Sequence, residues 1–370
     1  MKKKVLLGMS GGVDSSVAAV ILLEQGYDVT GVTLKLFDGD EYDAEKKSNV
    51  KTCCSLSDVE DARSVCIRLG IEHLVFNLKK EFQKSVITPF CNSYIKGETP
   101  NPCIECNRFI KWGEMLRRAE MLGFDCIATG HYARRVQVGD RFFLQKSKDV
   151  HKDQTYVLCH MTPGQISKTL LPLGEYEKSE VREIAAKHGF INAEKPDSQD
   201  ICFIPDKDYV KFIADETGFV LESGNFTDTA GKVLGRHRGH ICYTIGQRKG
   251  LGIALNRPMY VVKKNVQNNT VVLGEPGDLY TDVLYFRDLS TENFIGDSLH
   301  AAENHIEFPL KVQAKTRYSQ KSEDALLYKD RLVFANKIRA VTAGQTVCIY
   351  DGDIVLTGGY IAENSCENSE

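Results

Sequence analysis

The first third of the chain alternates between the hydrophobic spacing of strands and that of helices. Short apolar, β-branched runs indicate strands, and apolar residues recurring every three to four positions indicate helices. Strands are expected at 4–9, 28–37, 72–78 and 124–129, and helices at 13–25, 57–70 and 108–122. This alternation predicts an α/β fold in which a doubly wound parallel sheet carries helices on both faces.

The pattern changes after Pro205. Glycines crowd residues 224–252, helical periodicity fades, and from Met259 onward short β-branched runs are separated by turn sequences such as 275–277. These features predict a small central domain followed by a C-terminal β-barrel or sandwich. The expected division is a catalytic domain at 1–207, a central linker domain at 208–280 and a C-terminal β-barrel domain at 281–370.

Composition is typical of a folded globular protein. The chain has 370 residues, 42% hydrophobic and 26% charged, which is enough for two or three domains. The longest purely apolar run, 17–23, has seven residues, whereas a membrane helix needs about 20. Ser10-Gly11-Gly12 interrupts the apolar stretch near the N-terminus before a signal-peptide core forms. We therefore expect a cytoplasmic protein without a membrane segment.

Charge is unevenly distributed. The net charge of −3 gives no reason to expect nucleic acid, but the stretch 231–264 contains eight basic residues and no acidic ones. The basic residues are Lys232, Arg236, Arg238, Arg248, Lys249, Arg257, Lys263 and Lys264. Such a block suits a phosphate backbone. A solvated basic surface would have the same composition, so both interpretations stay open.

The segment Ser10-Gly11-Gly12-Val13-Asp14-Ser15-Ser16 lies directly between the first expected strand and helix. Glycines permit a tight turn, and hydroxyl and N–H groups at a helix N-terminus bind anions. The segment lacks the Gly-Lys-Ser/Thr ending of a Walker A loop and the glycine spacing of a Rossmann loop. It resembles the signature of the PP-loop ATP pyrophosphatases, which adenylate a substrate, and Thr129-Gly130-His131-Tyr132 fits the same family.

Three cysteines are candidates for chemistry. Cys103 and Cys106 form a C-x-x-C motif after Asn101-Pro102, and Cys106 is expected just ahead of a helix whose dipole would lower its thiol pKa. A zinc site would need two further ligands at similar spacing, and none lies nearby. Cys202 follows Asp200-Ile201, where its apolar neighbours would also fit a buried strand cysteine.

Six motifs, taken together and in this order, resemble the bacterial tRNA-specific 2-thiouridylases. They are SGGVDSS, TPNPCIECNRFIKW, TGHYAR, KDQTYVL, DSQDICFI and GQRKGLGI, and they extend over nearly the whole chain. The resemblance implies an ATP-dependent tRNA sulfurtransferase. Its expected substrate is the wobble uridine of the glutamate, glutamine and lysine tRNAs, and its expected partner is a persulfide sulfur donor protein.

Matched residue by residue, the resemblance implies three groups of site residues. Cys106 is the expected nucleophile, and Cys202 the expected carrier of a persulfide. The ATP-binding positions are Gly8, Met9, Ser10, Gly11, Gly12, Val13, Asp14, Ser15, Leu34 and Gly130. The target base is expected at Asn101, Pro102 and Cys103, and other tRNA contacts at His131, Lys152, Asp153, Gln154, Arg317, Tyr318 and Gln345. No residue is assigned as a metal ligand.

Cys103 departs from the family pattern, because many members carry there an Asp that is a proposed general acid/base. A thiol with a reference pKa of about 8.5 is a poor substitute for a carboxyl of about 3.9, which puts acid/base catalysis at this position in doubt. Cys103, Cys106 and Cys202 could instead hold three irons of a [4Fe-4S] cluster. The alternative function is therefore another PP-loop tRNA thiolase that uses this cluster, whereas the persulfide route needs only two cysteines.

The chemistry requires ATP because a uridine carbonyl oxygen is a poor leaving group. Adenylation activates it, with the loop and Mg²⁺ positioning the phosphates. Cys106 then either releases sulfide from the persulfide of Cys202 or resolves the bond after the terminal sulfur has attacked the base, and both orders stay open. Asp14 is expected to support magnesium, orient the loop or cap the following helix.

Overall fold

The computed structural model describes residues 2–37, 56–190, 200–290, 292 and 308–363. The chain divides into two compact units. Unit 1 contains residues 1–87, 102–207 and 353–356, and unit 2 contains 88–101, 208–352 and 357–370. The three-domain division with boundaries after 207 and 280 stays a prediction.

Unit 1 is built on a five-stranded parallel sheet with the order β3-β2-β1-β4-β7. Its strands are β1 (Lys4–Gly8), β2 (Asp28–Lys35), β3 (His73–Asn77), β4 (Cys126–Ala128) and β7 (Thr169–Leu170). The predicted parallel sheet is confirmed, and the four strands expected from the hydrophobic pattern all occur. The central strand β1 is apolar on both sides because helices cover both faces of the sheet.

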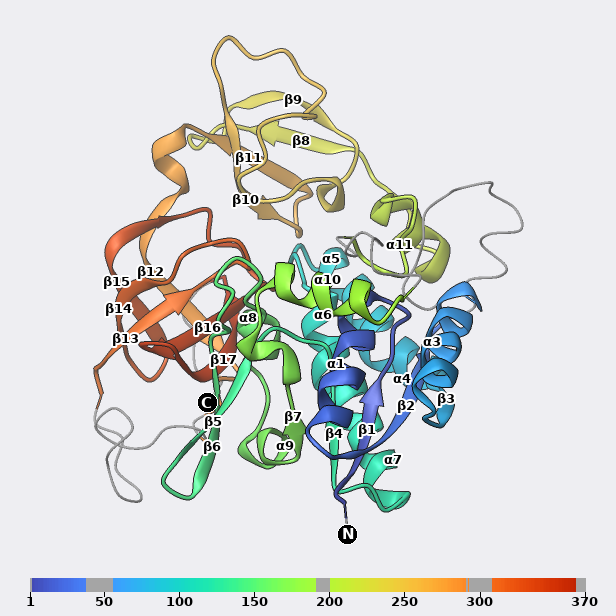
Figure 1. The fold of residues 1–370 in the computed structure, drawn as a ribbon. Helices are drawn as coiled ribbons and strands as arrows, with labels where there is room; N and C mark the ends of the chain where they lie inside the picture. The colour runs from blue at the N-terminus through green and yellow to red at the C-terminus, as the bar shows by residue number, and fades with distance from the viewer. Residues whose placement is uncertain (1, 38–55, 191–199, 291, 293–307, 364–370) are drawn as a thin grey trace. The chain divides into compact units, whose positions relative to one another are not determined.

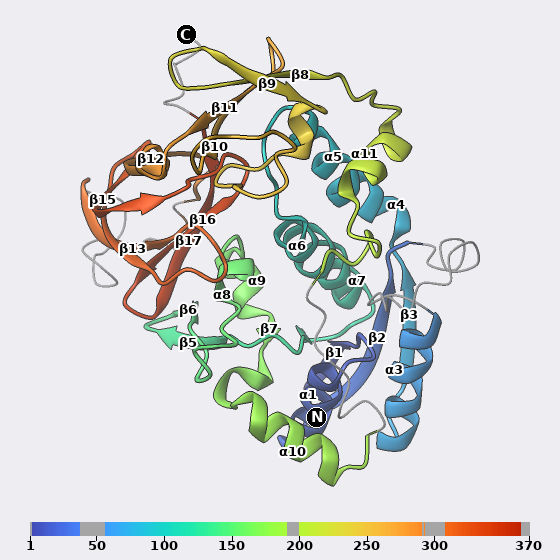
Figure 2. The same cartoon turned by 90° about the horizontal axis from the view of Figure 1, so that it is seen from above.

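Figures 1 and 2 show how these helices are arranged around β1 and β2. On one face, α1 (Val13–Glu24), α3 (Leu56–Leu69) and α10 (Lys178–Lys187) share a hydrophobic core with β1. On the opposite face lies the long helical segment that contains Cys106. Its Met115 packs close to Gly8, the last residue of β1.

The helical segment with Cys106 begins earlier than predicted. Helix α6 (Pro102–Glu105) continues directly into the π-helix η2 (Cys106–Met115) and then into α7 (Leu116–Met121). The expectation that Cys106 lies ahead of the helix was therefore wrong, since the first turn contains Cys103 and Cys106 follows it. Proline suits the first helical position, where its missing N–H is not needed, and this explains the start at Pro102.

The remaining elements of unit 1 are short. They are α4 (Lys79–Phe82), η1 (Gln83–Ile87), α8 (Thr155–Leu158), α9 (Pro163–Ser167), η3 (Pro172–Glu175) and the hairpin of β5 (Arg134–Val138) and β6 (Arg141–Gln145). Among the described residues of the whole chain, no helix is both long and apolar enough to cross a membrane.

Unit 2 contains a four-stranded sheet with the order β10-β11-β8-β9. The strands are β8 (Gly224–Thr227), β9 (Val233–His237), β10 (Tyr260–Asn265) and β11 (Thr270–Gly274). Unit 2 also contains α11 (Tyr209–Thr217), η4 (His240–Cys242), η5 (Pro276–Leu279) and, from an earlier part of the chain, α5 (Thr88–Ile95). Phe226, Tyr243, Val261, Val271 and Leu273 form the core of this sheet.

A six-stranded barrel follows. Its strands are β12 (Tyr280–Arg287), β13 (Leu310–Lys315), β14 (Glu323–Leu327), β15 (Arg331–Arg339), β16 (Thr346–Asp351) and β17 (Ile354–Ala362). They pair in the order β12-β15-β14-β13-β16-β17, and β17 pairs in turn with β12. This last pairing closes the sheet, so the predicted C-terminal β-barrel is confirmed.

A bulge in β10 decides which lysine of the basic block is buried. The register of β10 against β11 shifts between Val261 and Lys263, so that Lys264 and not Lys263 returns to the buried face. Lys264 is 5% exposed, and no described residue accepts a hydrogen bond from its ammonium. The expectation that Lys264 belongs to a basic surface was therefore wrong.

Replacing Lys264 by Met should remove a pH-dependent destabilisation of the folded protein. Burial lowers the pKa of Lys264 to about 8, although the charges of Glu363 and Glu98 oppose this shift. Because the unfolded chain keeps the proton up to about pH 10.4, the buried lysine destabilises the protein most below pH 8, and this cost fades between pH 8 and 10.4. Denaturant unfolding at pH 7 should show Lys264→Met to be as stable as the wild type or more stable, by up to roughly 3 kcal/mol.

The exposed neighbour Lys263→Met is the matched control for this experiment and should change stability little at any pH. The rise in stability between pH 8 and 10 should be smaller in Lys264→Met than in the wild type. A Lys264→Met protein that is less stable at pH 7 would contradict the argument.

Candidate active site

The candidate active site lies at the carboxyl edge of the parallel sheet in unit 1. β2 pairs with one side of β1, and β4 pairs with the other side. Where the strand order reverses in this way, a crevice opens at the carboxyl ends of the two strands, and open α/β sheets bind ligands there. The residues that follow β1 and β4 belong to the SGGVDSS and TGHYAR motifs.

The SGGVDSS loop turns tightly into α1. Gly11 has φ +69°, and a Cβ there would lie 2.6 Å from the carbonyl oxygen of Asp58, so that only glycine fits. The N-cap of α1 is Gly12, whose carbonyl accepts hydrogen bonds from the hydroxyls of Ser15 at 3.1 Å and Ser16 at 3.0 Å. The loop thus places main-chain N–H groups and the positive end of α1 at the crevice, where they suit a phosphate.

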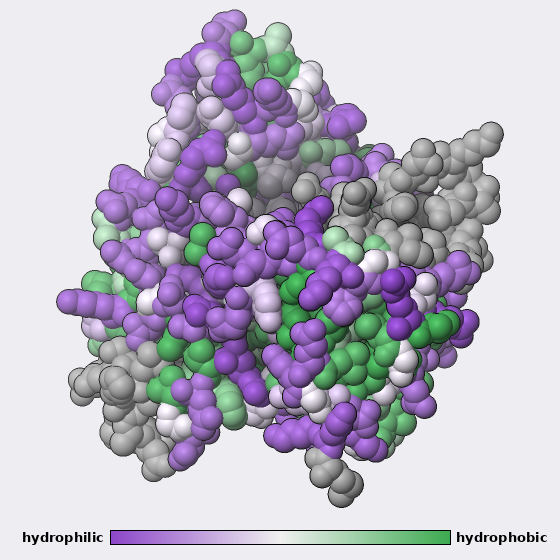
Figure 3. Space-filling view, in the orientation of Figure 1, coloured by the Kyte–Doolittle hydropathy of each residue, from purple (hydrophilic) through white to green (hydrophobic). Residues whose placement is uncertain are grey.

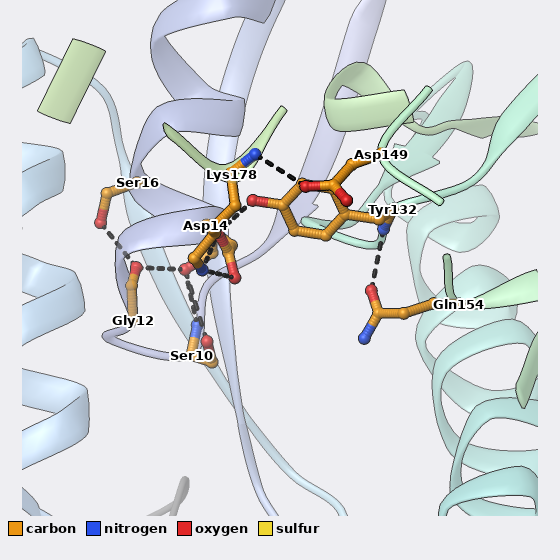
Figure 4. A network of polar contacts seen from close by, with 9 residues as sticks. Ser10, Gly12, Asp14, Ser16, Tyr132, Asp149, Gln154 and Lys178 are labelled. Carbon is orange, nitrogen blue, oxygen red and sulfur yellow. Dashed lines mark hydrogen bonds and ion pairs between the residues drawn. The ribbon is translucent and has the colours of Figure 1, made fainter. Parts of the chain in front are cut away.

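Asp14 is held by residues from two distant parts of the chain (Figure 4). The Lys178 Nζ lies 2.7 Å and 2.8 Å from the two carboxylate oxygens of Asp14, and the Tyr132 hydroxyl donates to Oδ1 at 2.8 Å. Lys178 is only 9% exposed, whereas the Asp14 side chain is 30% exposed, so this ion pair is partly shielded from water and screened less than a fully exposed pair. The Lys178 main-chain N–H also donates to Asp149 at 3.1 Å.

These contacts distinguish between the roles expected for Asp14. Capping was a wrong expectation, because Gly12 is the N-cap and Asp14 lies inside the first turn of α1. Both carboxylate oxygens accept from Lys178, and the expected support of magnesium by Asp14 stays a prediction. Orientation of the loop is the role that the contacts favour. Lys178 itself was missed in the sequence, where nothing marks it apart from other helical lysines.

Gly130 lies against the main chain of the SGGVDSS loop. A Cβ at this position would lie 2.9 Å from the carbonyl carbon of Asp14 and 2.9 Å from the nitrogen of Ser15. Main-chain atoms cannot move aside as a flexible side chain can, so the close approach of the two motifs requires glycine here. This contact brings together two segments that the sequence assigned separately to ATP.

The other residues assigned to ATP also lie at this edge of the sheet. Gly8 ends β1 and pairs with Val32, two residues before Leu34 on β2. Met9 follows Gly8, and its carbonyl accepts from the Thr33 hydroxyl at 3.0 Å. The ten assigned positions therefore belong to neighbouring elements, and their role in ATP binding stays a prediction.

The three candidate cysteines differ in setting. Cys103 is exposed and Cys106 partly exposed, both on the helix that starts at Pro102. Cys202 is partly exposed and lies in a turn, so its interpretation as a buried strand cysteine was wrong. The adjacent Phe203 packs edge-on against Phe82 at a centroid distance of 5.6 Å. Residues 197–199 of the same motif lie outside the described part of the chain.

An iron–sulfur site at these cysteines is not supported. Cys103, Cys106 and Cys202 are all described, and within the described residues no three His, Cys, Asp or Glu side chains are grouped so that they could hold a metal ion. The alternative function that depended on a three-cysteine cluster therefore has no support in the structure.

His131, expected at a tRNA contact, is 9% exposed. Its Nδ1 lies 2.7 Å from the Thr129 hydroxyl, and its Nε2 lies 3.3 Å from the Lys111 Nζ. Burial and the Lys111 ammonium hold the pKa of His131 well below its ordinary value, so the ring is neutral. An ammonium can only donate, and therefore Nε2 accepts from Lys111 while Nδ1–H donates to Thr129.

The segment Lys152-Asp153-Gln154, also expected at a tRNA contact, forms hydrogen bonds within unit 1. Asp153 is 8% exposed and accepts from the Ser147 N–H and the Thr155 hydroxyl. The Gln154 side-chain oxygen accepts from the Tyr132 N–H at 2.8 Å, and the Gln154 N–H donates to the Tyr132 carbonyl at 2.8 Å. Lys152 is partly exposed. Asp153 and Gln154 thus have clear structural partners, and their contact with tRNA stays a prediction.

In unit 2, the segment that ends at Asn101 is held by the barrel. Glu98 forms a bidentate ion pair with Arg287, whose two terminal nitrogens donate to the two carboxylate oxygens at 2.9 and 3.2 Å. The Thr99 N–H donates to Ala343 at 2.9 Å, and the Thr99 carbonyl accepts from the Gln345 side chain at 2.6 Å. Gln345, expected at a tRNA contact, therefore fixes the backbone two residues before Asn101.

The surface of unit 2 offers groups that suit RNA. Tyr318 is 43% exposed, with the Lys315 ammonium 5.7 Å from its ring centroid, while the neighbouring Arg317 donates to the Ala340 carbonyl. Most side chains on the visible face of the β8–β11 sheet and its loops are hydrophilic (Figure 3). The exposed basic residues of the block are Lys232, Arg236, Arg238, Arg248, Lys249, Arg257 and Lys263.

Comparison with protein families places this architecture in one class. Residues 3–206 match the model of a tRNA methyl transferase HUP domain, residues 210–275 match a tRNA methyl transferase PRC-barrel domain, and residues 291–361 match an aminomethyltransferase beta-barrel domain. The class is thus a HUP-type α/β domain joined to two β domains, in agreement with the observed parallel sheet and barrel.

Full-length relatives identify the family. The tRNA-specific 2-thiouridylase MnmA of Acetivibrio thermocellus is 51% identical over 367 residues, which cover 97% of this chain and 99% of that protein. The MnmA of Clostridioides difficile is 47% identical over 371 residues, with 98% and 99% coverage. The chain belongs to the tRNA-specific 2-thiouridylase family, and the resemblance inferred from its six motifs is confirmed.

Solved structures show only a weak likeness. A 4-thiouridine synthetase, solved as an RNA complex with bound ATP, is 20% identical, with 58% of this chain and 50% of that chain covered and a TM-score of 0.36. At that score the likeness carries no argument about the site.

Replacing Gly130 by Ala should weaken ATP binding, because the new methyl group would push the SGGVDSS loop out of place. An overpacking cost of about 1–3 kcal/mol corresponds to roughly a 5- to 150-fold loss of affinity, measurable by titration calorimetry. Gly164→Ala is the matched control, since a Cβ there would meet only the Thr162 hydroxyl, at 4.0 Å. Equal ATP affinity in Gly130→Ala and Gly164→Ala would contradict the requirement for glycine at 130.

Proposed function

We propose that this protein is a tRNA-uridine 2-sulfurtransferase that thiolates the wobble uridine at the expense of ATP. The observation that carries the proposal is that one compact unit holds both a phosphate-binding loop at a strand-order switch and the helix with Cys106. Relatives of about 50% identity, named tRNA-specific 2-thiouridylases, support the reaction and the substrate class.

ATP acts as the activating substrate. The C2 oxygen of uridine attacks the α-phosphate, pyrophosphate leaves, and the resulting adenylate turns a poor leaving group into AMP. The SGGVDSS loop binds phosphate oxygens through N–H groups at the start of α1, and the pairing of Asp14 with Lys178 keeps the loop in shape. Mg²⁺ accompanies the phosphates of ATP and offsets their charge, and no residue is assigned as its ligand.

Sulfur reaches the base through Cys202 and Cys106. In one order, the Cys106 thiolate attacks Sγ of the Cys202 persulfide, the S–S bond breaks, and the hydrosulfide released displaces AMP from C2. In the other order, the terminal sulfur displaces AMP first, and Cys106 then attacks Sγ of Cys202 and frees the thiolated base. Either order ends in a Cys106–Cys202 disulfide that a thiol reductant must reduce before the next turnover. The partly exposed setting of both cysteines supports these roles.

The partners in this proposal are tRNA and a persulfide donor protein. The family resemblance points to the glutamate, glutamine and lysine tRNAs as acceptors. Exposed basic side chains around the β8–β11 sheet and the exposed ring of Tyr318 supply phosphate and stacking contacts. A cytoplasmic location suits the chemistry, because reduced thiols persist in that compartment.

Cys106→Ser and Cys202→Ser should each abolish thiolation and leave adenylation intact, because only the sulfur step needs a thiol. The measurement compares pyrophosphate release with 2-thiouridine formation, using ATP, unmodified tRNA and a persulfide donor. Cys242→Ser, at a partly buried cysteine of unit 2, is the control and should keep both activities. Thiolation at the wild-type rate by either serine variant, or activity that requires stoichiometric iron, would contradict the persulfide route.

Arg248→Gln combined with Lys249→Gln should make tRNA binding less sensitive to salt. Both residues are exposed in the basic block, and each phosphate contact contributes about one unit to the slope of log affinity against log salt. The slope should therefore fall by about one to two units in this double variant. Arg182→Gln with Lys187→Gln, exposed on α10, removes the same charge and should leave the slope closer to the wild type. Equal slopes in the two double variants would assign Arg248 and Lys249 to a solvated surface.

A further inference from the structure

Two side chains that follow Cys106 tie its helix to other parts of unit 1. The Asn107 Nδ2 donates to the Val157 carbonyl at 2.9 Å, and the Lys111 Nζ donates to Nε2 of His131 at 3.3 Å. Asn107 is the residue directly after Cys106, and both lie in the π-helix η2 together with Lys111. π-Helical turns occur frequently at functional sites.

Both contacts lead to the ATP-binding loop. Val157 belongs to α8, which starts directly after Gln154, and two hydrogen bonds join Gln154 to the main chain of Tyr132. His131 is the residue directly before Tyr132. The Tyr132 hydroxyl donates to Asp14, the residue that Lys178 holds in the SGGVDSS loop. Two routes therefore connect the helix of Cys106 to Asp14, and they meet at Tyr132.

The setting of Asn107 is not explained by stability alone. The residue is 3% exposed, and its Oδ1 is buried without a hydrogen-bond donor among the described residues. A buried acceptor without a donor costs free energy, and an apolar side chain of similar size would avoid that cost. Two features set Asn107 apart. It directly follows the nucleophile Cys106, and its side chain donates a hydrogen bond to α8.

We propose that Asn107 and Lys111 are positioning residues that fix the Cys106 thiol relative to the ATP-binding loop, so that sulfur transfer depends on them while adenylation does not. This inference rests on the proposed function. A nucleophile has to lie within about 3–3.5 Å of the atom it attacks, and a misplacement of about 1 Å can slow a reaction roughly a hundredfold. The adenylate forms at the loop itself, which Lys178 holds through Asp14. The hydrogen bonds found for Asn107 and Lys111 go to α8 and to His131 and not to the loop.

The test uses Asn107→Leu and Lys111→Met in the full-length protein, with ATP, unmodified tRNA and a low-molecular-weight persulfide. Single-turnover thiolation should slow roughly 10- to 100-fold, whereas pyrophosphate release should stay within about twofold of the wild type. Lys111→Arg, which can still donate to Nε2 of His131, should recover most of the thiolation rate. Arg117→Met is the matched control, because Arg117 is exposed on the same helical segment and its partners in the described part of the chain are Glu114 and Met121, on its own helical segment.

A second readout separates position from reactivity. Alkylation of Cys106 by iodoacetamide, followed by mass spectrometry, should keep its rate in Asn107→Leu and Lys111→Met, because a freely diffusing reagent does not need a fixed thiol. Slower alkylation would mean that the thiol itself has changed, and this would overturn the inference.

The remaining outcomes are equally decisive. Parallel loss of pyrophosphate release and thiolation, or no loss of either, would overturn the positioning role. If Asn107→Leu does not fold, the comparison of Lys111→Met with Lys111→Arg decides. A wild-type protein that neither releases pyrophosphate nor forms 2-thiouridine would instead overturn the proposed function.

Discussion

The ion pair between Lys178 and Asp14 joins the start of α10 to the start of α1, and the geometry of the candidate site depends on it. α1 and α10 pack on the same face of the sheet around β1, in a core that includes Val17, Ala18, Val181 and Ala185. That packing brings the lysine within reach of the loop. The carboxylate of Asp14 also accepts a hydrogen bond from the Tyr132 hydroxyl. The TGHYAR segment lies so close to the main chain of the SGGVDSS loop that only glycine fits at position 130.

The cysteine motif has one part in each unit, and each part is held by contacts within its own unit. Before Asn101, unit 2 fixes the backbone through the pair of Glu98 with Arg287, the bonds to Thr99 and the bond from His240 to the carbonyl of Ile95. After Pro102, the chain belongs to unit 1 and is helical as far as Met121. The helix fixes the backbone of Cys106 within unit 1, which suits a reaction that needs a defined distance.

Several residues that the motif resemblance assigns to tRNA contact other parts of the protein in this structure. His131, Asp153, Gln154 and Gln345 were assigned to tRNA by their place in motifs, and in the structure each has hydrogen-bond partners within the protein. Tyr318 is the assigned residue whose exposure suits base stacking. A motif records that a residue type matters at a position, but the partner of its side chain depends on segments far away in the chain.

The sequence by itself determined the parallel sheet, the positions of four of its five strands, the C-terminal β domain and the loop that suits phosphate, because hydrophobic period and glycine placement act over a few neighbouring residues. The two-residue strand β7 is too short to give a hydrophobic period of its own and was missed. Only the tertiary structure decided the rest. The bulge that buries Lys264 arises from the pairing of β10 with β11, and the partner of Asp14 lies 164 residues away. Burial, ion pairing and a close approach such as that of Gly130 depend on which surfaces meet, and no local pattern of residues contains that information.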